Sequence, residues 1–307
     1  MTPQPVAAPR LALKVDCDTY EGTREGIPHL LRLFDRFHLR ASFFFTLGPD
    51  RSGRAIIRVF TRQGFLRKML RSRAVSMYGP RTMLYGTLLR APDIGRRLAA
   101  VIRSVAEAGH EVGVHGWDHV RWHDSLHRMS EKQIEREYGL AHERFTQIFG
   151  QPARASAAPG WHATATSLAV QEHYHLHYAS NTRGEVPFFP QAGGKRFETL
   201  EIPTTLPTWD ETLNAPEFPD HAAFIAYYRR ALAGTDVHSI HTEVEATAHR
   251  DLFRRQLEAW TADGVRFVTL AEMAADVLAR PASIPTRRLV RTTLPGRAGE
   301  VTGSEEV

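Results

Sequence analysis

The stretch LALKVDCD, residues 11–18, decides the fold class, because it joins a mostly apolar strand to two aspartates. Residues 11–16 predict a buried strand, and apolar side chains at helical spacing predict a helix over 25–38. The run ASFFFTL, 41–47, predicts a second strand. This order of strand, helix and strand is typical of a parallel sheet with helices between its strands.

The same alternation continues along the chain. A predicted helix ends at Gly109, the strand EVGVH follows at 111–115, and Ser130 with Gln133 makes a capping box for a helix that runs to Phe149. Further helices are expected near 220–233 and 247–262. Further strands are expected in RASAAP (154–159), LHYAS (176–180), LEIPTT (200–205), VHSIH (237–241) and VRFVTL (265–270). The pattern predicts a (β/α) barrel or a wound sheet, with its site at the carboxyl ends of the strands.

The composition favours one domain. The 307 residues are 42% hydrophobic, which is enough for a single core over 10–280, and the Pro-, Arg-, Thr- and Gly-rich residues 281–307 are expected to be a loosely ordered tail. A net charge of +5 is weak support for nucleic-acid binding. Cys17 is the single cysteine, which excludes a disulfide framework. The first residues lack the apolar core of an export signal, so we expect a cytoplasmic protein, at most attached to a membrane surface.

Residues 51–92 interrupt the alternation with a segment that has no acidic residue. Arginines alternate there with apolar and aromatic side chains, which is typical of a basic amphipathic segment. It is expected to dock on an anionic membrane surface, although a solvated hairpin that only covers the barrel, or a nucleic-acid contact, would show the same pattern. The residues expected to meet lipid are Arg62, Arg67, Lys68, Arg71 and Arg73.

Candidate site residues stand at the ends of three predicted strands. Asp16 and Asp18 share one face of the first strand, and two like charges at that spacing are unfavourable unless a cation lies between them or they take part in chemistry. His115 and His119 follow another strand at a spacing that lets two imidazoles reach one ion. Two aspartates or two histidines at such spacings are each common in proteins that bind no metal. Together, Asp18 and the two histidines make the two-nitrogen, one-oxygen ligand set of hydrolytic metal sites.

His241 ends a third strand. Because the ordinary pKa of histidine is near 6.5, an imidazole there can donate a proton at neutral pH, and we expect it to act as a general acid. A glycosidase that uses only the carboxylates of Asp16 and Asp18 would leave the histidines without a role.

The motifs KVDCDT (14–19), HGWDH (115–119) and SIH (239–241) resemble those of the polysaccharide deacetylase (NodB-homology) family of carbohydrate esterases, which implies a distorted (β/α) barrel of about seven strands. Longer strings make the likeness greatest to the family's deformylases, which act on undecaprenyl-phosphate-linked formamido-arabinose in the lipid A modification that gives polymyxin resistance. Those strings are VDCDTYEGTREG (15–26), RASFFFTLGPD (40–50), KMLRSRAVSMYG (68–79), HEVGVHGWDH (110–119), LPTWDE (206–211) and IHTEVE (240–245).

The resemblance implies that Asp18, His115 and His119 bind one divalent cation, that Asp16 is the general base and that His241 is the general acid. Zinc suits this ligand set best, and cobalt, manganese and nickel also tolerate it. The implied partners are the lipid-linked sugar and the anionic inner-membrane surface, with no nucleic acid. Residues expected to contact substrate are Trp117, Trp161, Arg183, Trp209 and Glu243, with the two tryptophans Trp117 and Trp161 as walls that discriminate formyl from acetyl.

The sequence departs from the family at one motif. The family has an arginine two residues before the proline of SAAPGW, where it orients the catalytic aspartate, and this chain has Ala157 there. Arg183 is the candidate substitute. The rival functions are a polysaccharide or peptidoglycan de-N-acetylase, for which an export signal would be expected, and a non-catalytic membrane-surface protein, which would lack at least one ligand, base or acid.

Overall fold

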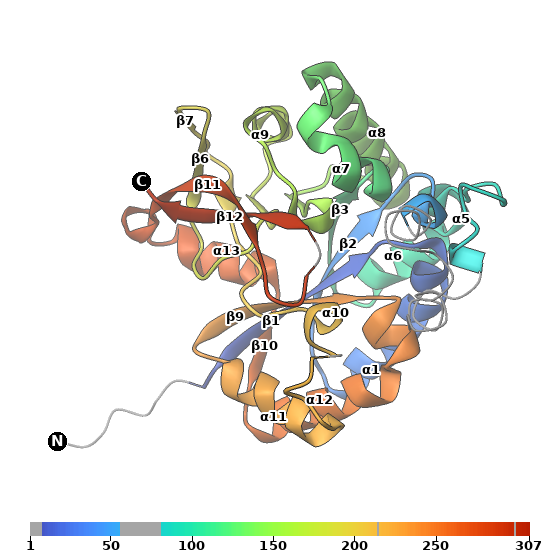
Figure 1. The fold of residues 1–307 in the computed structure, drawn as a ribbon, viewed down its shortest axis with the longest axis vertical. Coiled ribbons are helices and arrows are strands. Elements are labelled where there is room, and N and C mark those ends of the chain that lie inside the picture. The colour runs from blue at the N-terminus through green and yellow to red at the C-terminus, as the bar shows by residue number, and fades with distance from the viewer. Residues whose placement is uncertain (1–7, 56–80, 214, 298) are drawn as a thin grey trace.

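A single curled sheet of parallel strands organises the computed structural model, which describes residues 8–55, 81–213, 215–297 and 299–307 (Figure 1). The strands follow the order β9, β1, β2, β3, β4, β5, β8, and the short β10 pairs with the first residues of β1. The strands are β1 (Arg10–Cys17), β2 (Ser42–Thr46), β3 (Glu111–Gly116), β4 (Ala155–Ser156), β5 (Tyr178–Ala179), β8 (Leu200–Glu201), β9 (Thr235–His241) and β10 (Arg266–Val268).

The two ends of this sheet approach each other. Just after β8, the amides of Thr205 and Leu206 both donate to the carbonyl of Val237 in β9, at 3.1 Å each, and the Val237 amide donates to Thr205 Oγ1 at 3.0 Å. Together with the seven strands from β9 to β8, these bonds make the distorted barrel that the sequence predicts, with β10 as an additional short strand.

Side chains along β1 point alternately to the core between the sheet and its helices and to the core inside the barrel. Leu11, Leu13 and Val15 belong to the large core that the surrounding helices share. Ala12 instead packs with Phe44 and side chains from most other strands, inside the barrel. Lys14 and Asp16 have the same parity as Ala12, so the strand's period of two directs them into the barrel.

Helices pack around the outside of the sheet, and five of them supply most of the outer core: α1 (Ile27–Arg36), α6 (Ala99–Glu107), α8 (Glu131–Phe149), α11 (His221–Ala231) and α12 (Arg250–Ala262) (Figure 1). The predicted capping box of α8 is present, and the helix ends at Gly150 in the left-handed conformation. The other helices are η1 (Gly22–Gly26), α5 (Ile94–Arg97), α7 (His119–Ser125), η2 (Leu126–Arg128), η3 (Pro159–Trp161), α9 (Ala165–Glu172), α10 (Trp209–Thr212), η4 (Val244–Ala248), α13 (Leu270–Leu278) and η5 (Pro281–Ser283).

The expectation of a loosely ordered tail after residue 280 is wrong. β11 (Thr286–Thr293) and β12 (Glu300–Glu306) form an antiparallel hairpin, and β11 also pairs with β6 (Phe189–Ala192), next to β7 (Lys195–Arg196). Pro295, Gly296 and Gly299 lie in the turn of the hairpin, and Pro281 and Pro285 precede its first strand, whereas the strands carry β-branched side chains that favour pairing.

Most of the basic segment lies outside the described residues, including Arg62, Arg67, Lys68, Arg71 and Arg73. Its two described ends meet where the Gly53 amide donates to the Tyr85 carbonyl at 3.1 Å. Among the helices in the described residues, none has both the length and the apolar character needed to span a bilayer.

Candidate active site

The carboxyl ends of β1, β3 and β9 meet at one pocket, whose empty volume, including the part open to solvent, is about 550 Å³. The pocket brings together all five residues expected to carry the chemistry. Its lining includes Asp16, Asp18, His115, His119, His123, Trp161, Asp210, His241 and Arg297.

Asp18 lies between two imidazoles. Its carboxylate oxygens are 3.1 Å from His115 Nε2 and 3.3 Å from His119 Nε2, and one ligand atom from each residue lies within 4.8 Å of the others. Burial would raise the pKa of Asp18, but the charges of His119 and His115 outweigh burial and hold that pKa well below its ordinary value. Two ring nitrogens and a carboxylate crowded in this way fit a divalent cation.

The turn between the two histidines is fixed by its backbone. Gly116 has a φ of +112°, which favours glycine and breaks the strand directly after His115. The buried Asp118 then caps α7 by accepting from the Arg121 amide at 3.0 Å, which places His119 in the first turn of that helix. The Trp117 side chain packs on Gly48 and is not among the residues that line the pocket, so the structure does not bring this expected substrate wall to the site.

Asp16 has a cationic partner that the sequence analysis missed. Lys14 Nζ lies 3.4 Å from Asp16 Oδ2 and donates to the Ser180 carbonyl at 3.2 Å, and both charged side chains are buried. Ser239 Oγ is also 3.4 Å from Oδ2, while Oδ1 has no hydrogen-bond partner. The signal was present, because a lysine two residues before an aspartate in a buried strand must share its face.

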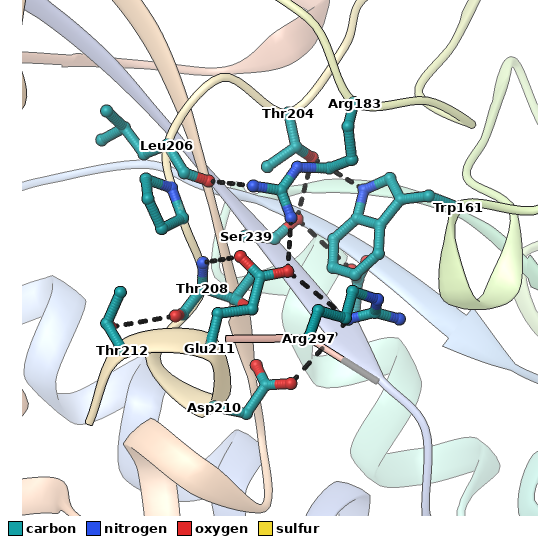
Figure 2. A network of polar contacts seen from close by, with 12 residues as sticks. Trp161, Arg183, Thr204, Leu206, Thr208, Asp210, Glu211, Thr212, Ser239 and Arg297 are labelled. Carbon is teal, nitrogen blue, oxygen red and sulfur yellow. Dashed lines mark hydrogen bonds and ion pairs between the residues drawn. The ribbon is translucent and has the colours of Figure 1, made fainter. Parts of the chain in front are cut away.

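Arg183 does not orient Asp16, so the expected substitution for the family arginine is wrong. Its guanidinium donates to Glu211 Oε1 at 2.7 Å and to the Leu206 carbonyl at 3.0 Å, and it lies over the ring of Trp161 (Figure 2). The strong attraction of a buried carboxylate holds it on the side of α10. Lys14, from β1 itself, contacts Asp16 instead.

His241 is held in a protonated state by its surroundings. Burial would lower the pKa of its imidazole, but the charge of Asp210, followed by those of Asp18, Glu245 and Asp16, raises it to about 9. The His241 amide donates to Glu245 Oε2 at 2.8 Å, which fixes the end of β9. Asp210 is therefore the group whose charge most stabilises the imidazolium.

Of the remaining residues expected to contact substrate, Trp161 lines the pocket, whereas Trp209 and Glu243 do not. Trp161 lines the pocket, edge-on to His241 with ring centroids 6.3 Å apart, and donates to Thr204 Oγ1 at 3.0 Å. Trp209 is fully buried in the outer core, so a substrate contact there is wrong. Glu243 is buried behind the pocket, where burial first and the charge of Asp18 second raise its pKa to about 8.

Comparisons with known proteins show the family and the fold. A family model described as polysaccharide deacetylase matches residues 6–179. The chain is 38% identical, over 86% of its length and 85% of the relative's, to a 4-deoxy-4-formamido-L-arabinose-phosphoundecaprenol deformylase of Shewanella sediminis. It is 30% identical to the protein of that name in Wigglesworthia glossinidia brevipalpis, over 93% and 99% of the two chains. A polysaccharide deacetylase structure from Mycobacterium smegmatis has the same fold, with a TM-score of 0.64, 18% identity and coverage of 95% and 97%.

We predict that Lys14→Met destabilises the protein by ~3–5 kcal/mol, because breaking a buried ion pair leaves a charge without its partner. Turnover should also fall, because Asp16 Oδ2 loses the contact with Lys14 that holds it in place. Denaturant unfolding and the turnover rate measure the two effects. Lys195→Met, on the exposed strand β7, is the matched control, and a Lys14 variant that behaves like this control would show that the pair has no such role.

Proposed function

The chain belongs to the polysaccharide deacetylase family, and from this premise we propose that it is a metal-dependent hydrolase that removes the formyl group from 4-deoxy-4-formamido-L-arabinose carried on undecaprenyl phosphate. The observation that carries the proposal is the single pocket that holds Asp18, His115 and His119 beside Asp16 and His241. Two relatives named as deformylases of this lipid-linked sugar support this choice of substrate.

Asp18, His115 and His119 are the proposed ligands of the cation. A divalent cation bound there would polarise the formyl carbonyl and lower the pKa of a water molecule. Asp16 Oδ1, which makes no hydrogen bond and lies 3.7 Å from His115 Nδ1, is the proposed acceptor of the water proton, while Lys14 and Ser239 keep Oδ2 in place. Asp16 then acts as a general base with one fixed and one available oxygen.

His241 is the proposed general acid. An amine leaves an amide only if its nitrogen gains a proton, and the imidazolium that Asp210 stabilises has one to give. Water supplies the hydroxyl that completes formate and the proton that restores the amine, so the reaction balances without any further reactant. The products are formate and the 4-amino sugar on its lipid carrier.

Contact with a membrane is part of this proposal, because a sugar on a long prenyl chain stays at the bilayer. At the described end of the 51–92 segment, Leu88 is 83% exposed and Leu89 41% exposed, beside the exposed Arg90. Exposed leucines next to an arginine support docking of this edge on an anionic surface. We propose that the protein works at the cytoplasmic face of the inner membrane.

The proposal predicts faster release of formate from the formamido lipid-linked sugar than of acetate from its acetamido form, by ~10- to 200-fold if an apolar wall such as Trp161 alone discriminates. Both products should be measured on the same carrier, with chitin fragments as a third substrate. Equal activity on chitin fragments would support the polysaccharide deacetylase, and no turnover of any substrate would support a non-catalytic protein.

We predict that Asp18→Asn, His115→Ala and His119→Ala each empty the metal site, because three ligands leave no spare one to hold the ion. Metal content after dialysis is the measurement. Asp16→Asn and His241→Ala are the matched controls, since neither residue is a proposed ligand. They should keep metal while turnover falls by ~10²- to 10⁴-fold. Full occupancy in His115→Ala would remove it from the ligand set.

The pH dependence provides a separate prediction. A general acid with a pKa of about 9 is charged at neutral pH and loses its proton as the pH rises through that value, so activity should fall on the alkaline side. Asp210→Asn removes the largest charge that raises this pKa and should move the alkaline limb to lower pH. A bound cation would lower the pKa of His241 in both the wild type and the Asp210→Asn variant, so the two pH–rate profiles are measured with the same metal. An unchanged alkaline limb would contradict the assignment.

A further inference from the structure

The C-terminal hairpin is fixed at the rim of the pocket. Thr302 in β12 is buried, and its hydroxyl accepts from the Ala163 amide at 2.9 Å while its carbonyl accepts from the Arg183 amide at 2.9 Å. Val301 beside it is 1% exposed. These contacts bring the turn between β11 and β12 over the segment that carries Trp161.

That turn delivers Arg297 into the pocket. Its guanidinium lies 4.7 Å from the ring centroid of Trp161, with Nη1 at 3.6 Å from Glu211 Oε1 and 3.9 Å from Asp210 Oδ2 (Figure 2). Neither contact is close enough for a hydrogen bond, and the buried Nε has no partner. Among the described residues that line the pocket, Arg297 is the only arginine or lysine.

The close approach of the turn depends on Gly296. Its φ is +75°, and a Cβ added there would overlap the backbone oxygen of Glu211 in α10. Gly299, in the same turn, also has a positive φ, of +92°, but open space surrounds its missing Cβ. Only Gly296 is therefore required for the contact with α10.

Neutralising Glu211 does not require Arg297. Glu211 Oε1 already accepts from Arg183 at 2.7 Å, and Oε2 accepts from the Thr208 amide at 3.0 Å. In the pocket itself, a divalent cation and the His241 imidazolium would offset the carboxylates of Asp16, Asp18 and Asp210. The charge of Arg297, whose contacts with Asp210 and Glu211 are longer than hydrogen bonds, would then remain in excess, and its Nε has no hydrogen-bond partner.

We propose that Arg297 binds the phosphate group of the substrate, so that the C-terminal hairpin recognises the anionic carrier of the sugar. Guanidinium donors match phosphate oxygens in charge and geometry. This inference rests on the proposed function, which supplies a substrate with a phosphate next to the sugar. Arg297 is a binding residue in this scheme and moves no proton.

The test compares two formamido-arabinose substrates, one on a short prenyl phosphate and one as the neutral methyl glycoside. Arg297→Gln should lower kcat/KM for the phosphate substrate roughly 10- to 100-fold more than for the glycoside, and the additional loss should arise mainly through KM. Arg291→Gln is the charge control, because Arg291 lies on the hairpin but pairs with Glu300 at the exposed surface, and it should change neither substrate. Equal losses on both substrates, or none on either, would overturn the proposal.

A second variant leaves the guanidinium intact. Gly296→Ala should push the turn off α10 and reproduce the selective loss on the phosphate substrate, whereas Gly299→Ala bears the same positive-φ strain without the overlap and should not. Similar effects of the two alanines would contradict the role of the turn.

Binding of geranyl phosphate, with geraniol as the uncharged control, separates this inference from the proposed function. The wild type should bind the phosphate at least ~10-fold more tightly than Arg297→Gln, both with metal and after chelation, because phosphate also binds cations. Arg297-dependent binding without formate release would contradict the deformylase function but support the phosphate site at Arg297. Formate release without such binding would support the deformylase function but contradict the phosphate site.

Discussion

The buried ion pair between Lys14 and Asp16 is the constraint around which the site is organised. A carboxylate inside a barrel is unstable unless a cation and hydrogen-bond donors surround it, and here the cation comes from the same strand, two residues earlier. Because residues two apart in β1 share a face, the strand places both charged side chains inside the barrel. Its neighbour β9 adds Ser239 on one side of the pair and His241 at the strand end. Asp16 and His241, the proposed base and acid, are thus held by two adjacent strands as register partners.

The sequence predicted the parts of the site that follow from strand periodicity. Because parallel strands end at one edge of a sheet, Asp16, His115 and His241 could be expected to meet there. Side chains that reach the pocket from elsewhere could not be found in this way. Arg297 lies in a turn rich in glycine and proline, and its place depends on how a second sheet packs against the barrel, which no local pattern encodes.

The two tryptophans that proved not to line the pocket illustrate the same limit. Trp117 stands between two site histidines, yet the turn at Gly116 directs it toward Gly48. Trp209 precedes Asp210, and because consecutive helical residues face different directions, one is in the core while the other lines the pocket. A position next to a functional residue in the sequence did not predict where these side chains point. The rule that residues two apart in a strand share a face would have identified Lys14 as the partner of Asp16.

The pairing of β1 also affects how the chain folds. Its register joins Leu11 to Phe267 in β10 and to Asp236 in β9, so the central strand meets three neighbours of which two are far away in sequence. Contacts of such high sequence separation slow folding, and during synthesis the edge of β1 stays unpaired until most of the chain has been made. An apolar strand waiting in this state is prone to aggregate. Lys14 and Asp16 within it supply charge during that interval, and charged residues inside an apolar strand oppose aggregation.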